Sequence, residues 1–403
     1  MKGVKRLMTF ALFSVLVLIC AIELWIRNTR SSSADIVVQV FSDTGTVPFK
    51  TQPETLMIKH LSYQNVPGRE NACIIMLARN SDKKNVVKTL ATFESTFNAR
   101  YMYPYVFFNQ EPFDDDFKDA VSSATEAKVR FELIPQDQWS IPPNFNRSAV
   151  LESFRKQGER PGLKAELENY HHMCRYFSGF FATHPALRDF KYYWRLEPSV
   201  SYYCTLNYDP FELMRKQNKI YGFNIVGVEI LWTVPTLWSS TLEYLHSRNR
   251  SFPLHLRAFD QRTGDEPESE SRYNYKYFFN NFEIADLDFF RSDEYLDYFK
   301  FLDDKGGFFF ERWGDAPVHT LGIALFLDPS QVHYFHDIGY RHEGYIHCPV
   351  DIPEDGVAYE TCHCRDQMPK SDSIMRVSDS TWEDALKYYL RIVPELNLES
   401  YIG

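Results

Sequence analysis

The sequence lacks a surplus of basic side chains, because 44 lysines and arginines stand against 54 aspartates and glutamates, and the formal net charge is −10. A phosphate backbone requires a clustered basic face, so this balance argues against a nucleic-acid partner. The chain also lacks an internal repeat. With 44% hydrophobic and 24% charged residues, it has the composition of an ordinary globular protein, which excludes a disordered chain and a collagen-like repeat. Aromatic residues make up 16%, which is typical of a large core and also of sugar binding.

Long hydrophobic runs are scarce, which excludes a protein that spans the membrane several times. The long apolar run is Leu7–Ile26, and about 20 such residues cross a bilayer as one helix. Lys2, Lys5 and Arg6 precede it, so the short N-terminus is expected to stay in the cytoplasm. A cleavable signal peptide is the alternative, but no small-residue cleavage site follows the run. We therefore expect a cytoplasmic tail at 1–6, a signal anchor at 7–26, a luminal stem at 27–66 and a luminal globular domain at 67–403.

Two features fit a luminal location. The tripeptides beginning at Asn146 and Asn249 have the form of N-glycosylation acceptors. Six of the seven cysteines follow the anchor, an even number that suits an oxidising compartment and allows fifteen pairings. Cys73 lies in an apolar run typical of a strand, which indicates a buried free thiol.

The late cysteines leave two interpretations open, a pair of disulfides or a zinc site. Histidines stand beside them, at His347 and His363, as a zinc site would need. The Cys-x-Cys spacing at Cys362 and Cys364 lacks the usual two-residue gap of a zinc motif, so disulfides are favoured.

Strands and helices alternate from residue 71 onward. Apolar strand-like runs are predicted at 73–78, 103–108, 129–134, 190–196 and 219–226. Helices are predicted at 86–97, 114–127, 163–183, 235–246, 293–304 and 316–327. The polar stretch 258–272 is predicted to be a surface loop. This order is typical of an α/β protein with a mixed, mainly parallel central sheet flanked by helices.

Ligands of such a sheet bind beyond the carboxyl ends of its strands. Arg79 follows the first predicted strand, and Glu197 follows the central one, where Pro198 ends the strand. A carboxylate there can bind a divalent metal on a diphosphate, although a salt-bridged acid would look the same. The run Asp114–Asp116 resembles an acidic metal motif, but it opens a predicted helix, where acids complement the helix dipole.

Five segments in one order carry a family resemblance. They are Tyr170–Arg175 (YHHMCR), Tyr193–Val200 (YWRLEPSV), Asn280–Ile284 (NNFEI), Trp313–His319 (WGDAPVH) and Asp337–His342 (DIGYRH). Together they resemble the fungal type II Golgi α-1,2-mannosyltransferases, glycosyltransferase family 15. The resemblance implies a nucleotide-sugar transferase fold, a single-pass type II Golgi membrane location and transfer of mannose from GDP-mannose with Mn²⁺ and retention of configuration. The implied acceptor is a mannosylated glycoprotein, with N- or O-linked glycans extended through α-1,2 linkages.

The resemblance also implies roles for single residues. It makes Glu197 and His342 metal ligands, and Glu283 the nucleophile or the stabiliser of an oxocarbenium ion. It makes Asp315 a second catalytic residue, and it places Tyr170 and Arg195 in substrate binding. Arg79 is expected to bind substrate because of its position after the first predicted strand, not because of the resemblance. Mn²⁺ would neutralise the leaving diphosphate without proton transfer.

Residues around Glu283 suggest how its carboxylate is oriented. Asn280 and Asn281 are expected to hydrogen-bond it, and Phe282 to limit water. The segment 275–279 reads YKYFF, where the family has Cys-His-Phe-Trp, so acceptor choice stays open. Mannosylphosphate transfer and an inactive glycan-binding or scaffolding Golgi protein are the competing functions. A glycosidase would need two carboxylates at a fixed separation, which sequence alone does not show.

Overall fold

The computed structural model describes residues 69–160, 164–262, 267–349 and 362–364. Within these residues no helix combines the length and the hydropathy needed to cross a membrane. The predicted tail, anchor and stem all lie outside the described residues, and so does Cys20.

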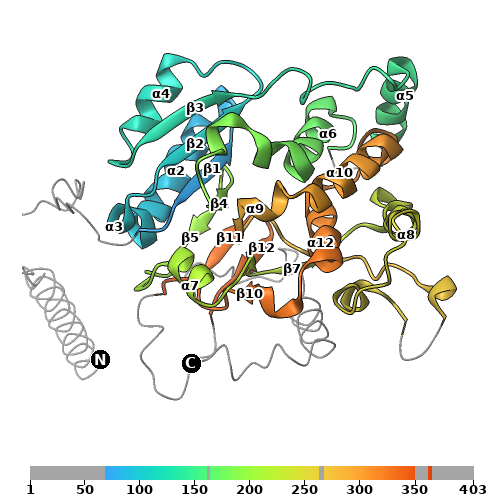
Figure 1. Ribbon diagram of the computed structural model, residues 1–403. Coiled ribbons are helices and arrows are strands. Elements are labelled where there is room, and N and C mark those ends of the chain that lie inside the picture. Colours follow the sequence, from blue (N-terminus) through green and yellow to red (C-terminus); the bar gives the residue numbers. More distant parts are fainter. Residues whose placement is uncertain (1–68, 161–163, 263–266, 350–361, 365–403) are drawn as a thin grey trace, which may run out of the picture. The chain divides into compact units, whose positions relative to one another are not determined.

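A mixed sheet forms the centre of the described fold (Figure 1). Among the described residues it has seven strands: β1 (Ala72–Leu77), β2 (Tyr105–Asn109), β3 (Val129–Leu133), β4 (Tyr192–Leu196), β6 (Tyr221–Phe223), β9 (Glu283–Asp286) and β10 (Val332–Tyr334). Their order is β10-β6-β9-β4-β1-β2-β3, and β9 runs antiparallel to both β4 and β6. The other pairs are parallel. The predicted mixed, mainly parallel sheet is confirmed.

Two smaller antiparallel sheets accompany it. In one, β11 (Tyr340–His342) lies between β5 (Ser201–Tyr202) and β12 (Tyr345–His347). In the other, β7 (Val226–Val228) pairs with β8 (Lys276–Phe278). The single strand predicted at 219–226 is therefore wrong, because its residues divide between β6 in the central sheet and β7 in a separate one.

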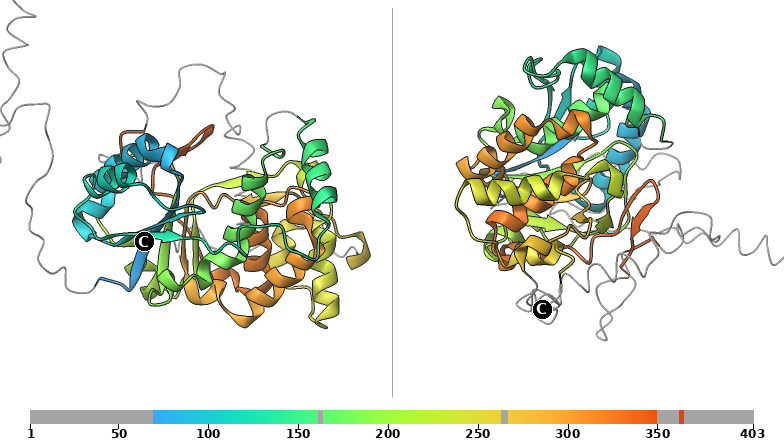
Figure 2. Two further views of the ribbon diagram at one scale, coloured as in Figure 1. Left: turned by 90° about the horizontal axis from the view of Figure 1, so that it is seen from above. Right: turned by 90° about the vertical axis from the view of Figure 1, so that its right-hand side faces the viewer.

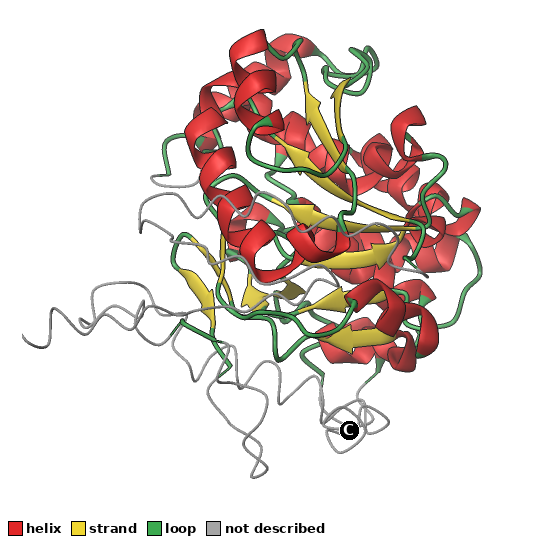
Figure 3. Ribbon diagram, turned by 90° about the vertical axis from the view of Figure 1, so that its left-hand side faces the viewer, coloured by secondary structure: helices red, strands yellow, loops and turns green. Residues whose placement is uncertain are grey.

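Helices cover both faces of the central sheet (Figures 2 and 3). The described α-helices are α2 (Lys83–Phe93), α3 (Ala99–Tyr101), α4 (Asp115–Ser122), α5 (Arg147–Gln157), α6 (Glu168–Arg175), α7 (Pro210–Lys216), α8 (Leu237–Ser247), α9 (Leu287–Phe290), α10 (Asp293–Lys305), α11 (Gly307–Phe310) and α12 (Asp315–Phe326). Strand β1 illustrates how both faces are covered, because its successive side chains point to opposite faces of the sheet. Ile74 and Met76 belong to the same hydrophobic cluster as residues of α2, α4 and α7, whereas Cys73 and Ile75 belong to the cluster that includes residues of α5, α8, α10 and α12.

Several predicted boundaries shift for local reasons. Lys164 has a left-handed φ of 54°, so the helix predicted from 163 begins only at Glu168. After Arg175 it continues as a π turn (Tyr176–Phe180) and a 3₁₀ turn (Phe181–Thr183). The helix predicted at 114–127 ends at Ser122.

The stretch predicted as a surface loop, 258–272, is partly buried. Asp260 is 1% exposed and bridges to Tyr273. Its carboxylate accepts hydrogen bonds from the backbone and side chain of Arg262, from Ser271 Oγ and from the backbone of Arg272. This carboxylate therefore ties the base of the stretch to the core.

The cysteines settle the question of disulfide or zinc. Cys204 pairs with Cys362 and Cys348 with Cys364, while Cys73 and Cys174 are buried free thiols. Disulfides and the free Cys73 are confirmed. The zinc interpretation is wrong, because the three late cysteines are oxidised and the described residues contain no cluster of three or more potential ligands.

Candidate active site

The turn after β4 presents two oppositely charged side chains. Arg195, the fourth residue of this strand, is 2% exposed and donates from Nε and Nη2 to Glu197 Oε1, at 2.8 and 2.7 Å. Its guanidinium also stacks 3.7 Å from the ring centre of Phe177. Pro198 and Ser199 then turn the chain, and Ser199 takes a φ of 73°, a conformation that costs a non-glycine residue energy and clusters at functional sites. Burial raises the pKa of Glu197, although Arg195 opposes this.

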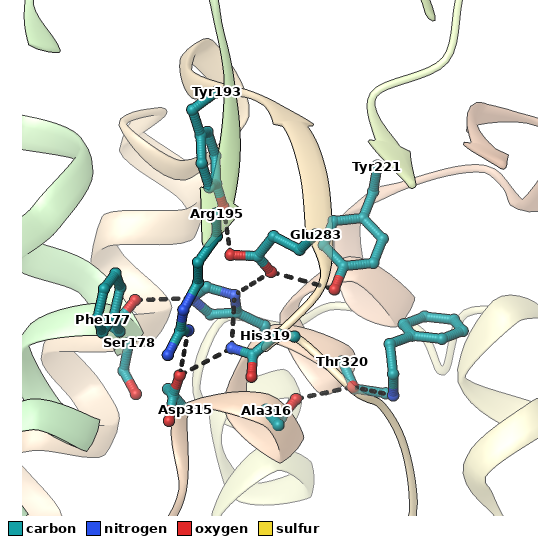
Figure 4. A network of polar contacts seen from close by, with 12 residues as sticks. Phe177, Ser178, Tyr193, Arg195, Tyr221, Glu283, Asp315, Ala316, His319 and Thr320 are labelled. Atoms are coloured by element: carbon teal, nitrogen blue, oxygen red, sulfur yellow. Dashed lines mark hydrogen bonds and ion pairs between the residues drawn. The ribbon is translucent and has the colours of Figure 1, made fainter. Parts of the chain in front are cut away.

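Arg195 also binds the N-terminus of α12. Its Nη1 lies 2.6 Å from Asp315 Oδ2, which in turn accepts from Asn280 Nδ2 at 2.8 Å (Figure 4). Asp315 is the first residue of α12, where a carboxylate complements the helix dipole. Burial alone would raise the pKa of Asp315, but the charge and hydrogen bond of Arg195 outweigh burial and lower it. Asp315 is therefore a buried, ionised group that Arg195 connects to the central strand.

Glu283 lies on β9 and is completely buried. Tyr193 Oη donates to its Oε1 at 2.6 Å, Tyr221 Oη donates to its Oε2 at 3.1 Å, and His319 Nδ1 lies 3.0 Å from the same Oε2 (Figure 4). Burial, and then the charge of Glu283, raises the pKa of both tyrosines. Two tyrosine hydroxyls thus fix both carboxylate oxygens, and a histidine from a third element contacts one of them.

The expected orientation of Glu283 by the neighbouring amides is wrong. Asn280 donates to Asp315, and Asn281 makes no side-chain hydrogen bond to Glu283 among the described contacts. The actual partners come from β4, β6 and α12. One of them had a usable sequence signal, because Tyr193 stands two residues before Arg195 and must share its face of the strand.

His342, the last residue of β11, lies near this cluster. Its ring centre is 6.1 Å from that of Phe279, and Arg195 acts electrostatically on it. Burial lowers the pKa of His342 to about 4, so the imidazole is neutral at neutral pH, the form in which histidine binds metals. Tyr340, two residues earlier, has a fully buried hydroxyl that finds no partner within the described residues, and the charge of Glu197 acts on it.

These observations fit a divalent cation. Glu197 offers a carboxylate with Oε1 fixed by Arg195, His342 offers a neutral imidazole, and Mn²⁺ accepts both ligand types. The buried Tyr340 hydroxyl indicates room for a further polar group.

Tyr170 forms a second polar group with Arg312 and Glu229, next to the cluster around Arg195. Arg312 Nη1 donates to Tyr170 Oη at 3.1 Å, and Arg312 Nη2 pairs with Glu229 at 3.0 Å. Burial raises the pKa of Tyr170, and the charge of Asp315 adds to this effect. The structure therefore brings Tyr170 close to the cluster, together with Arg312 and Glu229, which the sequence reasoning missed.

Arg79 stands apart from the buried cluster. Its side chain is 68% exposed and pairs with Asp82 at 2.9 Å in the 3₁₀ turn that follows β1. It does lie at a carboxyl end of the sheet, as expected, so it faces solvent on the side where ligands of this architecture bind.

The acidic run at 114–116 begins helix α4, as predicted. Asp114 caps α4, its Oδ1 accepting from Phe117 N at 2.7 Å. Asp115 and Asp116 form the exposed first turn and pair with Lys118 and Lys83.

The chain is similar to several known proteins. The sequence profile of the family described as glycolipid 2-alpha-mannosyltransferase matches residues 33–373. The O-glycoside alpha-1,2-mannosyltransferase omh1 of Schizosaccharomyces pombe is 42% identical over 309 residues, covering 74% of this chain and 78% of the relative. The glycolipid 2-alpha-mannosyltransferase of Saccharomyces cerevisiae is 40% identical, covering 72% of this chain and 64% of the relative.

Solved structures show the same fold. Core-mannan synthase A of Aspergillus fumigatus, in its Mn/GDP form, has a TM-score of 0.68 at 36% identity and covers 82% of this chain and 92% of its own. The mannosyltransferase Ktr4p of S. cerevisiae in complex with GDP has a TM-score of 0.70 at 35% identity, with coverages of 81% and 82%. The expected glycosyltransferase fold is thus confirmed, and the chain belongs to the glycolipid 2-alpha-mannosyltransferase family, glycosyltransferase family 15.

Proposed function

We propose that this protein is an Mn²⁺-dependent enzyme that transfers mannose from GDP-mannose to a mannosyl residue on N- or O-linked glycans of glycoproteins, forming α-1,2 linkages with retention of configuration. The observation that carries this is the buried cluster at the end of β4, where Arg195 joins Glu197, Asp315 and the face bearing Glu283. Relatives are named α-1,2-mannosyltransferases, and related structures contain GDP, one of them with Mn.

Glu197 and His342 would hold the manganese ion. When bound, Mn²⁺ would neutralise the charge that develops on the leaving diphosphate. Arg195 orients Glu197 by fixing Oε1, and the exposed Arg79 at the end of β1 can contact the donor from the solvent side.

Glu283 and Asp315 would provide the negative charge of the reaction centre. An oxocarbenium-like transition state carries positive charge, which a fixed carboxylate stabilises without moving. Glu283 has both oxygens fixed by donors, and an attack on the anomeric carbon would require one oxygen to leave them. This favours charge stabilisation by Glu283 over covalent catalysis. Tyr170, held by Arg312, and Arg195 would position the sugars.

We also propose that the protein is a type II Golgi membrane protein with its catalytic domain in the lumen. The apolar run at 7–26 supports an anchor. Two disulfides in the described residues suit an oxidising lumen. Asn146 and Asn249, the two glycosylation candidates, are both exposed. Sensitivity of these two sites to an endoglycosidase, in membranes that protect the domain from protease, tests this topology.

A donor and acceptor screen with the full-length protein tests the reaction. We expect mannose transfer from GDP-mannose to mannosides only with Mn²⁺, and a product that is cleaved by an α-1,2-specific mannosidase. A phosphorus-containing product would instead establish mannosylphosphate transfer. Glycan binding without release of GDP under all conditions would establish a binding or scaffolding protein and overturn the proposal. Comparing a mannosylated peptide with an N-glycan then decides the acceptor.

A further inference from the structure

The imidazole of His319 lies between two groups that only accept hydrogen bonds. His319 is on α12 and completely buried. Its Nε2 is 2.7 Å from the backbone oxygen of Phe177, and its Nδ1 is 3.0 Å from Glu283 Oε2 (Figure 4). A neutral imidazole carries one N–H, whereas a carbonyl and a carboxylate supply none. The two contacts therefore require one proton more than a neutral histidine and an ionised glutamate possess.

The hydrogen bonds of Glu283 locate this proton. Besides His319, the carboxylate faces the hydroxyls of Tyr193 and Tyr221, each of which donates to it. These two hydroxyl donors, one on each carboxylate oxygen, favour the ionised form of Glu283 over its protonated form. Asn280 Nδ2 also lies 3.5 Å from His319 Nδ1, but Glu283 Oε2 is closer to Nδ1, at 3.0 Å, and the shorter bond of Asn280 goes to Asp315, at 2.8 Å. The carboxylate oxygen is therefore the main partner of Nδ1.

The charge balance of the cluster points the same way. Three carboxylates, those of the buried Asp315 and Glu283 and the partly buried Glu197, act on the single guanidinium of Arg195. Unpaired buried charges are costly, so a second cation inside the cluster is favourable. The ionisable groups that face or pack around His319 are Glu283 on β9, Tyr193 and Arg195 on β4, Tyr221 on β6, Tyr295 on α10 and Asp315 on α12.

We propose that His319 is an imidazolium that positions Glu283: it keeps this carboxylate ionised and fixes it on the sheet face that also carries Arg195. The inference rests on the proposed function, in which the charge of Glu283 acts on the transferred sugar. His319 itself has no role in contacting the sugar, because its two ring nitrogens are occupied by Phe177 and Glu283.

The protonation of His319 can be measured directly. Solid-state NMR of the full-length chain with ¹⁵N-labelled histidine distinguishes a protonated from a bare ring nitrogen, and the His319 signals are those lost in His319→Gln. We expect both nitrogens of His319 to be protonated at pH 7, and one to become bare in Glu283→Gln. His255 is the neutral reference, since burial lowers its pKa to about 4. A bare nitrogen on His319 in the unaltered chain, or an unchanged signal in Glu283→Gln, overturns the proposal.

Kinetics separate positioning from a general structural effect. In His319→Gln we expect turnover to fall by about 100-fold, the scale of a small misplacement at a reaction centre, while the dissociation constant for GDP stays unchanged. His255→Gln removes another buried histidine, one that faces a backbone carbonyl, and we expect turnover close to normal. Normal turnover in His319→Gln, or an equal loss of GDP binding, contradicts positioning. The NMR measurement requires no donor, so it stands even if mannose transfer is disproved.

Discussion

Arg195 on β4 and Glu283 on β9 are register partners in an antiparallel ladder, so both side chains leave the sheet on the same face. Helix α12 covers this face and adds Asp315 and His319. Arg195 also reaches Glu197 beyond the end of its own strand. One guanidinium thus connects the central strand, the turn that carries the proposed metal ligand, and the helix above them.

Replacing Arg195 by lysine tests this connection. An ammonium keeps the charge but lacks the planar fork that reaches two carboxylates at once, so one carboxylate loses its partner. We expect turnover to fall by about 100-fold and the free energy of unfolding to fall by about 1–3 kcal/mol. Chemical denaturation and initial rates measure the two effects. Arg155→Lys is the matched control on the exposed face of α5, where neither quantity should change. Equal behaviour of the two variants would contradict the role of Arg195.

The metal assignment predicts different effects for two acidic sites. Glu197→Gln removes the charge but keeps the shape, and His342→Ala removes the imidazole. Each variant should lower the apparent affinity of the enzyme for Mn²⁺ by about 10–100-fold. Metal titrations of the initial rate give the apparent affinity.

Asp114, Asp115 and Asp116 provide the control. Changing all three to asparagine keeps the capping capacity at Asp114 and leaves the exposed first turn of α4 polar. The Mn²⁺ dependence should be unchanged. A triple variant that lost its metal response while Glu197→Gln kept it would reverse the assignment.

Glu283→Gln should abolish most turnover without loss of donor binding. The amide keeps the outline of the side chain but has no charge to stabilise the transition state, which typically costs about 3–4 kcal/mol, or two to three decades in rate. Single-turnover transfer and calorimetric GDP-mannose binding measure the two quantities. Glu94→Gln is a matched control, because Glu94 is a partly buried carboxylate that accepts from Tyr105 Oη at 2.5 Å and lies outside the cluster. Loss of donor binding in Glu283→Gln would assign this residue a structural role instead.

Acid should destabilise the fold through its buried neutral histidines. Burial lowers the pKa of His255 from 6.5 to about 4. Between these values the unfolded chain binds a proton that the native protein does not, so stability falls as the pH decreases from about 6.5 towards 4. His255 alone contributes on the order of 3 kcal/mol across this range. Denaturation at a series of pH values should show a smaller pH dependence for His255→Gln. An unchanged dependence would mean that His255 does not contribute.

Local patterns in the sequence predicted several of the strands and helices and one proposed metal ligand. Buried parallel strands such as β1 appear in the sequence as short apolar runs, because both faces of the sheet are covered. The acids at 114–116 predicted a helix start, because acidic side chains in the first turn complement the helix dipole. Glu197 was predicted as a metal ligand because a strand followed by Glu-Pro places a carboxylate at the ligand edge of the sheet, and because the family resemblance gives it this role. Boundaries shifted where the backbone left the regular regions, as at Lys164.

What surrounds Glu283 was decided only by the tertiary structure. Its donors Tyr193, Tyr221 and His319 are 90, 62 and 36 residues away along the chain. They meet because β9 enters the sheet antiparallel between β4 and β6, and this register selects the face on which Glu283 lies. A shift by one residue would turn Glu283 to the opposite face. The nearby Asn280 is hydrogen-bonded to Asp315 instead, so proximity in sequence pointed to the wrong partner, and only the pairing of the strands identifies the right ones.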